Sequence, residues 1–311
     1  MLKDHKKITL LIPVYNEETA IAIFLDEVSK ILKPIDNLDY EFLFVNDGST
    51  DSTLEMLIEQ KERFKNIIII DFSRNFGKEA ALTAALDLAK GDAVIPIDVD
   101  LQDPPEVIID MLALWEDGAD VVLGKRIDRS DDSFLKRITA NWFYKIHNYL
   151  SEHKIPENVG DFRLMSHQVV QSIKRVPENQ RFMKGLMSWV GFKVAFVEYK
   201  RQKRISGKSK FNYWKLWNFA LDGITNYGIS PLRIWTYVGL VVTIPAFGFM
   251  LYVIAAYFIS NSNVDGYASI MVSITFLGGL QLIGIGVIGE YLGRTYMETK
   301  KRPIYIIKKI I

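Results

Sequence analysis

The segment AVIPIDVDLQDPPE, at residues 93–106, indicates both the fold and a candidate site. Its apolar first half fits a strand that is buried on both faces, as the strands of parallel sheets are. Side chains alternate along an extended chain, so Asp98 and Asp100 are expected to point to the same side. Two carboxylates on one side repel each other unless a cation lies between them, which favours a divalent metal site. The alternative is a pair of acids that are only solvated at the end of a strand.

Short β-branched runs alternate with helical stretches on the N-terminal side of this segment. Strands are expected in ITLLIPV, YEFLFVND and NIIIIDFS, and helices at about 19–32, from about Ser52 onward, and at about 79–90. Strands that alternate with helices predict an α/β fold of the Rossmann-like type, with a mostly parallel sheet and helices on both faces. In such sheets the ligand lies beyond the carboxyl ends of the strands, where the polar motifs of this sequence fall.

Three further polar motifs follow predicted strands. PVYNEE (13–18) and VNDGSTD (45–51) each combine a turn with a carboxylate or amide, a combination suited to gripping a base and a ribose. SRNFGKEAAL (73–82) places Arg74 and Lys78 before a helix, where the turn would face phosphate. The second motif is also a good turn and helix cap, and that alternative stays open for Ser49, Thr50 and Asp51.

The composition excludes several classes of function. Lys and Arg total 38 and Asp and Glu total 37, so no strong overall field attracts nucleic acid, and an anionic partner needs a local patch. The chain has no cysteine, which excludes disulfides, thiolate nucleophiles and cysteine-ligated metal sites. Its 4 histidines are not clustered, so carboxylate ligation of Mg²⁺ or Mn²⁺ is expected.

Two apolar stretches near the C-terminus, at about 233–259 and 268–292, are each long enough to cross a bilayer as a helix. The connection between them carries no Lys or Arg, whereas KRQKR precedes the pair and KKRP follows it. The positive-inside rule therefore predicts a multi-pass hairpin in the inner or plasma membrane, with the catalytic domain and both termini in the cytoplasm. A buried hairpin of a soluble protein is the alternative.

The domain organisation follows from these stretches. We expect a catalytic domain at 1–205, an amphipathic juxtamembrane segment at 206–231, a transmembrane hairpin at 232–296 and a basic cytoplasmic tail at 297–311. The aromatic and basic residues at 210–228 suit a helix lying in a membrane interface, and an ordinary core helix is the alternative. Small residues in the second span would let helices approach closely, which favours a homo-oligomer. The alternative is that these glycines face the lipid.

Six motifs together carry a resemblance to a known family. PVYNEE, VNDGSTD, RNFGKEAAL, DVDLQDPPE, GDFRLMS and RISGKSKFNYWKL occur in this order over nearly the whole chain. They resemble the inverting family-2 glycosyltransferases of the dolichyl-phosphate mannose synthase type. They look more closely like the bacterial undecaprenyl-phosphate glycosyltransferases that carry a two-helix C-terminal anchor. The resemblance implies a GT-A fold and metal-dependent transfer of a hexose from a nucleotide sugar to a polyprenyl phosphate, for modification of cell-envelope glycans.

The same resemblance implies roles for individual residues. Asp161 matches the acid near the reacting centre, with Arg163 beside it, and Asp98 lies near the ribose or the metal. The metal is expected on Asp100 and Gln102. The nucleotide sugar, UDP-glucose by first choice, is expected to contact Pro13, Tyr15, Glu17, Asp47, Asn75, Lys78 and Asp98. The acceptor phosphate is expected at Arg126, Arg204, Ser209 and Lys210.

The chemistry of the acceptor supports this assignment independently. A lipid monophosphate has its second pKa at about 6, so its oxygen is already an anionic nucleophile at neutral pH. The enzyme then has to supply alignment and positive charge, and the basic stretch 200–210 offers charge beside the membrane. Asp161 is therefore expected to orient the acceptor or to stabilise positive charge on the sugar rather than to remove a proton. Three alternatives stay open: a basic loop that serves only membrane topology, a polysaccharide or glycolipid synthase with a non-phosphate acceptor, and a lipid-glycan transporter.

Overall fold

The computed structural model describes residues 2, 4–127, 156, 158–179, 181, 183–202, scattered positions between 232 and 252, and 266–311. The amphipathic segment expected at 210–228 lies outside the described residues, as do Arg204, Ser209 and Lys210. Most of the first expected membrane span lies outside them as well.

A single mixed sheet organises the described part of the chain. Its strands are β1 (Lys6–Val14), β2 (Leu38–Asn46), β3 (Ile67–Phe72), β4 (Ala93–Pro96), β5 (Val121–Arg126), β6 (Val159–Ser166), β7 (Val194–Tyr199) and β8 (Ile307–Ile310). Their order across the sheet is β7-β5-β6-β4-β1-β2-β3-β8. Strand β1 pairs in parallel with β2 and β4, β2 with β3, and β5 with β7. Strand β6 runs antiparallel between β4 and β5, and β8 runs antiparallel to β3.

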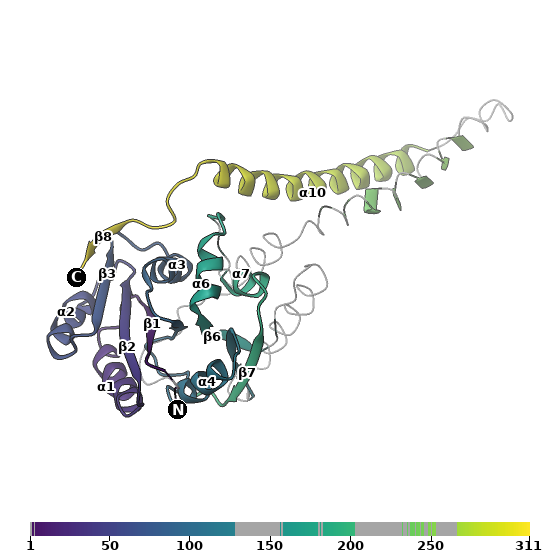
Figure 1. The fold of residues 1–311 in the computed structure, drawn as a ribbon. Coiled ribbons are helices and arrows are strands. Elements are labelled where there is room, and N and C mark those ends of the chain that lie inside the picture. Colours follow the sequence, from purple (N-terminus) through teal and green to yellow (C-terminus); the bar gives the residue numbers. More distant parts are fainter. Residues whose placement is uncertain are drawn as a thin grey trace.

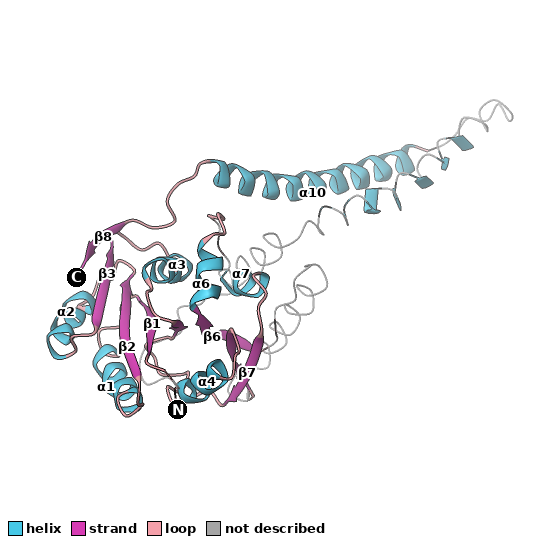
Figure 2. Ribbon diagram, viewed as in Figure 1, coloured by secondary structure: helices cyan, strands magenta, loops and turns pink. Residues whose placement is uncertain are grey.

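Helices cover both faces of this sheet, as predicted (Figures 1 and 2). One face packs against α1 (Ile21–Leu32), α2 (Thr53–Arg63) and α4 (Val107–Glu116). The other packs against α3 (Lys78–Leu88), α6 (His167–Lys174) and α7 (Met183–Trp189). The first three predicted strands and the first three predicted helices are found within a few residues of the expected positions.

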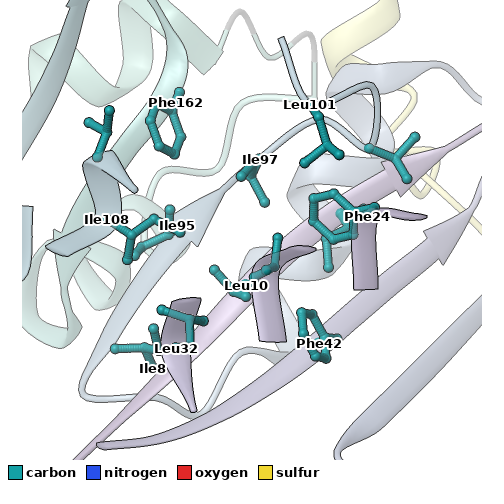
Figure 3. Close-up of a cluster of buried hydrophobic side chains, with 14 of the residues drawn as sticks. Ile8, Leu10, Phe24, Leu32, Phe42, Ile95, Ile97, Leu101, Ile108 and Phe162 are labelled. Carbon is teal, nitrogen blue, oxygen red and sulfur yellow. The ribbon is translucent and has the colours of Figure 1, made fainter. Parts of the chain in front are cut away.

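The alternation of side chains along β1 explains the two apolar layers. Ile8 and Leu10 enter one buried cluster with Phe24 of α1 and Phe42 of β2, whereas Leu11 enters the cluster on the other face (Figure 3). Central strands of a parallel sheet bury both faces, so their sequences are continuously apolar rather than alternating. This buried frame fixes where each strand ends, and the polar loops that follow the strands are positioned by it.

The C-terminal part consists of the 33-residue helix α10 (Tyr267–Thr299) followed by β8. Among the described residues, only the Phe276–Thr299 part of α10 is long and apolar enough to cross a membrane, judged by length and composition. After α10 the chain returns to the catalytic domain and adds β8 to the edge of the sheet beside β3 (Figure 1). From the sequence, residues 297–311 were expected to form a separate basic tail, and strand β8 was not predicted.

Candidate active site

The loops after β1 and β2 are bonded to each other at the carboxyl edge of the sheet. The backbone N–H of Asn16 donates to Ser49 Oγ at 3.0 Å, and the backbone N–H of Thr50 donates to Asn16 Oδ1 at 2.8 Å. Asn16 adopts a positive φ of 54°, which asparagine tolerates better than most residues. Asp51 caps α2 by accepting the N–H and the hydroxyl of Thr53 at 3.1 and 2.6 Å. The capping alternative is therefore correct for Asp51, while Ser49 and Thr50 join the two loops.

Asp47 holds the loop after β3 through its carboxylate. It accepts the backbone N–H groups of Phe76 and Gly77 at 2.6 and 2.9 Å and is 4% exposed. Burial raises the pKa of this carboxyl above its ordinary value, although the two N–H donors and Arg74 act in the opposite direction. The observed contacts give Asp47 a positioning role for the segment that leads into α3, and contact with a nucleotide stays a prediction.

Gly48 makes the same junction possible because it has no side chain. A Cβ at this position would lie 2.4 Å from the carbonyl carbon of Arg74 and 2.5 Å from the backbone N of Asn75. Its φ of +63° is also in the left-handed region, where other residues are strained. The glycine of the NDGS sequence is therefore required by backbone packing between two loops of the site.

The acidic segment after β4 departs from the expected geometry. Strand β4 ends at Pro96, residues 99 and 100 form a turn, and Leu101 has a φ of +52°. The expectation that Asp98 and Asp100 share one side of an extended chain is therefore wrong, because the chain is not extended there. Asp100 is 9% exposed and accepts the backbone N–H of Gln102 at 3.1 Å, a contact that stabilises the turn.

Lys78, the first residue of α3, joins two carboxylates from different strands. Its ammonium lies 2.7 and 2.9 Å from the two oxygens of Asp98 and 2.9 Å from Asp161 Oδ2. Burial lowers the pKa of Lys78, but the two facing carboxylates outweigh this effect and the pKa lies above its ordinary value. Lys78 is therefore a permanent cation between an acid at the end of β4 and an acid on β6. The sequence predicted all three residues in the site but not this contact.

Comparisons with known proteins identify the family. Residues 9–174 match glycosyl transferase family 2, and residues 230–295 match a family described as the GtrB C-terminal hairpin. The chain belongs to glycosyl transferase family 2. A prophage bactoprenol glucosyl transferase homolog of Escherichia coli K12 is 56% identical over 304 residues, which cover 98% of this chain and 99% of that protein.

Two other relatives match over similar lengths. A bactoprenol glucosyl transferase of Shigella phage SfV is 55% identical over 304 residues, covering 97% of this chain and 98% of that protein. An uncharacterized glycosyltransferase of Synechocystis, sll0501, is 47% identical over 304 residues, covering 98% and 95%. The α/β sheet with its polar carboxyl edge is therefore the GT-A catalytic domain of a membrane-associated glycosyltransferase, as the sequence predicted.

A second charged cluster of this glycosyltransferase lies at the ends of β5 and β7. Tyr199 donates its hydroxyl to Asp103 Oδ1 at 2.5 Å, while Arg126 Nε donates to the Tyr199 hydroxyl at 3.2 Å and Nη2 donates to Asp103 at 3.4 Å. Burial raises the pKa of Asp103, and Arg126 and Tyr199 offset part of that rise. Arg126 also interacts electrostatically with Asp161, so it adds positive charge on a second side of this acid.

The start of the basic stretch 200–210 is bonded to the backbone beside this cluster. The backbone N–H of Gln202 donates to the carbonyl of Gln102 at 2.9 Å, directly beside the acidic turn. The sequence predicted Arg126 but neither Asp103 nor Tyr199, which lie 96 residues apart in the chain. A tyrosine at the end of a strand carries no sequence signal for so distant a partner.

Arg163 lies on the same strand as Asp161 but is 3% exposed. Its Nη2 donates to the carbonyl of Gly160 at 2.8 Å, a contact within β6 itself. Such a contact favours support of the strand that carries Asp161, and the predicted catalytic role of Arg163 stays a prediction.

The other residues predicted to contact the nucleotide sugar lie at the same edge of the sheet. Pro13 is in β1 in register with Val45, and the backbone N–H of Glu17 donates to Thr53 Oγ1 at 2.9 Å. Tyr15 is partly buried, and Asn75 is exposed in the loop before α3. Asn46 and Asp71, which the sequence analysis did not name, are joined by a buried 2.8 Å hydrogen bond beneath the NDGS turn.

The acidic turn fits a divalent cation that takes part of its coordination from a substrate. Within the described residues there is no group of three or more His, Cys, Asp or Glu side chains that could form an all-protein cage. Mg²⁺ is commonly held by one or two carboxylates together with substrate phosphates, and hard oxygen ligands suit Mn²⁺ as well. Asp100 and Gln102 provide carboxylate and amide oxygens on one tight turn, so their chemistry fits such a site.

Proposed function

We propose that this glycosyltransferase moves glucose from UDP-glucose to a polyprenyl phosphate, with undecaprenyl phosphate as the first choice, and inverts the anomeric centre. The names of the E. coli and Shigella phage relatives, both bactoprenol glucosyl transferases, support glucose and a polyprenyl carrier. The match extends through the hairpin region, so the part of the chain expected to meet the lipid is also shared.

The bridge of Lys78 between Asp98 and Asp161 is the observation that carries the proposal. It brings the acid of the donor motif and the acid of β6 to one cation at the carboxyl edge of the sheet. Transfer requires donor and acceptor to be aligned at one point, and alignment alone lowers a bimolecular barrier by several kcal/mol. In this proposal, the salt bridges of Lys78 mark the point at which the nucleotide sugar and the lipid phosphate are aligned.

The reaction needs little proton transfer. An anionic oxygen of the lipid phosphate attacks the anomeric carbon as the bond from that carbon to the diphosphate breaks, and UDP leaves with the bonding electrons. Asp161 would orient the acceptor or stabilise positive charge that develops on the sugar. Lys78 and Arg126, which both interact with Asp161, would offset the repulsion between this carboxylate and the arriving phosphate.

Asp100 and Gln102 would hold a Mg²⁺ or Mn²⁺ ion, with Asp98 near that ion or the ribose. When bound, such an ion neutralises charge on the departing nucleoside diphosphate. The backbone geometry that Asp47 and Gly48 impose on the loop before α3 would keep Asn75 and Lys78 at the diphosphate.

The membrane arrangement is part of the proposal. The hairpin match and the apolar α10 support membrane spans. The placement of the catalytic domain and both termini in the cytoplasm rests on the positive-inside rule. We place the acceptor phosphate at Arg126, Arg204, Ser209 and Lys210, because the last three of these residues lie shortly before the chain enters the membrane region. We also propose a homo-oligomer, based on the small residues of the second span.

A reconstitution assay tests the function. Full-length protein in liposomes that contain undecaprenyl phosphate and Mg²⁺ is given radiolabelled UDP-glucose, and organic extraction measures lipid-linked glucose. UDP-N-acetylhexosamines and GDP-mannose serve as competing donors, and a soluble glycan and a neutral glycolipid as competing acceptors. We expect label in the polyprenyl phosphate product from UDP-glucose. Label only in a glycan or neutral lipid would refute the acceptor, and preference for another nucleotide sugar would refute the donor.

A further inference from the structure

The last turn of α10 is bonded to the catalytic domain. The two carboxylate oxygens of Glu298 accept the backbone N–H of Asn179 at 3.0 and 3.1 Å, and one of them accepts Asn179 Nδ2 at 3.2 Å. Asn179 lies in the connection between α6 and α7. Hydrogen bonds to an ionised acceptor are roughly twice as strong as neutral ones. The hairpin match ends at residue 295, so this contact lies just beyond the hairpin.

The residues after α10 make a second attachment, to β3 and α3. Strand β8 pairs with β3, and the backbone N–H of Ser73 donates to the carbonyl of Ile306 at 3.0 Å. The ring of Tyr305 stacks on Phe72 with centroids 5.3 Å apart and an interplanar angle of 8°. Its hydroxyl donates to Asp87 Oδ2 at 2.8 Å.

Both attachments reach the helix that carries Lys78. Asp87 is in the last turn of α3, and Glu79, next to Lys78, accepts the backbone N–H of Met183 at the start of α7 at 2.9 Å. Helix α3 is therefore joined to Tyr305 near one end and, through α7 and its preceding connection, to Glu298 near the other. In Figure 1, α3 lies between β3 and α6, next to the segment through which the chain returns from α10 to β8.

Protection of a sheet edge explains only part of this arrangement. An exposed edge strand invites pairing with other chains, and β8 covers the edge of β3. Edge protection does not require Glu298 to bond to Asn179, which belongs to a different part of the domain. It also does not require a partly buried tyrosine to bond to an acid on α3. The contacts instead resemble a two-point attachment between a membrane helix and a catalytic domain.

We propose that Glu298, Tyr305 and β8 form a clasp that positions the active site at the height of the membrane-embedded acceptor. This inference rests on the proposed function, because it concerns delivery of a lipid acceptor. The chain between catalytic domain and hairpin already supplies one connection, about which the domain could rotate. A second attachment removes that freedom, and a fixed geometry raises the effective concentration of a bilayer-bound group at the site. Glu298 and Tyr305 are thus positioning residues.

The test compares two acceptors on full-length protein in liposomes: undecaprenyl phosphate in the bilayer, and a short, water-soluble prenyl phosphate. The variants are Glu298→Gln with Tyr305→Phe, and a deletion of residues 304–311. Matched controls are Glu290→Gln and Tyr296→Phe, on the same helix, where Glu290 pairs with Arg294 and Tyr296 is 59% exposed. We expect the bilayer reaction of both clasp variants to fall about tenfold and the soluble reaction to stay within about twofold.

Hydrogen exchange of backbone amides in the same proteins measures whether the clasp is formed, independently of enzyme activity. The amides of Asn179 and Ser73 should exchange faster in the clasp variants than in wild type and in the controls. Equal losses with both acceptors would show a purely structural role and overturn the inference, as would an unchanged bilayer rate despite faster exchange. Failure of the proposed function has a different signature, because the unmodified protein would then form no polyprenyl-linked glucose in either assay.

Discussion

Replacement of Lys78 by methionine tests the charge arrangement of the site most directly. Methionine keeps the length and the apolar stem of the side chain but removes the ammonium that joins Asp98 and Asp161. The two carboxylates then lose their shared cation, and they repel the phosphate groups of both substrates. We expect the variant to fold and to lose transfer activity.

The magnitude follows from the geometry. A charge pair at 2.9 Å with an effective dielectric constant of 20 has an energy of about 6 kcal/mol, whereas exposed pairs contribute about 1 kcal/mol or less. The side chains of Lys78 and Asp98 are 40% and 37% exposed, which places the contribution nearer the lower limit. We take about 3 kcal/mol for the two contacts together, which corresponds to a loss of about a hundredfold in kcat/KM.

Lys125 provides a matched control for this experiment. It pairs with Glu198 at 2.9 Å with side chains 41% and 56% exposed, similar in exposure to the Lys78 pair, and neither residue was predicted to belong to the site. Steady-state kinetics with UDP-glucose and bilayer acceptor, together with thermal melting, are measured for Lys78→Met and Lys125→Met. Lys125→Met should keep wild-type kcat/KM. Equal effects of the two substitutions, or a Lys78→Met enzyme within twofold of wild type, would refute the reasoning.

Three further predictions concern neighbouring residues. Gly48→Ala should destabilise the protein by about 2–4 kcal/mol in urea unfolding, since its Cβ would meet the Arg74 backbone; a wild-type midpoint would contradict this. Asp100→Asn should weaken Mn²⁺ binding in the presence of UDP about tenfold by electron paramagnetic resonance, and unchanged affinity would exclude Asp100 as a ligand. Burial raises the pKa of Glu178, and the charge of Glu298 raises it further. The Glu178 carboxyl therefore binds its proton more tightly in the native state than in the unfolded chain. As a result, the stability of the protein falls as the pH rises through the native-state pKa of Glu178. Glu178→Gln should therefore melt above wild type at about pH 7.5, with a difference that shrinks toward about pH 4.

The first four strands of the sheet were predictable because their signal is local. Continuous apolar runs with β-branched residues, separated by helical stretches, place β1 to β4 and α1 to α3 close to their observed positions. Strand β8 gave no such signal, since residues 307–310 read as a short basic tail and gain their strand conformation only by pairing with β3. Secondary structure that depends on pairing with a distant segment cannot be predicted from the local sequence pattern.

The candidate site was predictable in its residues more than in its contacts. Asp98, Lys78 and Asp161 were each identified from motifs, yet the salt bridge among them depends on how β4, α3 and β6 pack. The alternation argument failed for Asp98 and Asp100 because β4 is shorter than its apolar run suggests and the chain turns at once. Asp47 was expected to contact a nucleotide, whereas its visible bonds go to the backbone of the next loop.

The balance of charge at the carboxyl edge explains why a site for two anionic substrates contains so many acids. In the described cluster Lys78 interacts with Asp98 and Asp161, Arg126 interacts with Asp103 and Asp161, and Arg201 interacts with Asp103. These three cations are already engaged by carboxylates, so they offer little spare positive charge to a diphosphate. A divalent cation that enters with the nucleotide balances the negative charge of the diphosphate, so the donor brings its own counter-charge. We propose that the lipid phosphate, which arrives without a metal, finds positive charge in the basic stretch 200–210. This division assigns the divalent cation to the donor and the basic stretch to the acceptor, so the two anionic substrates draw on separate sources of positive charge.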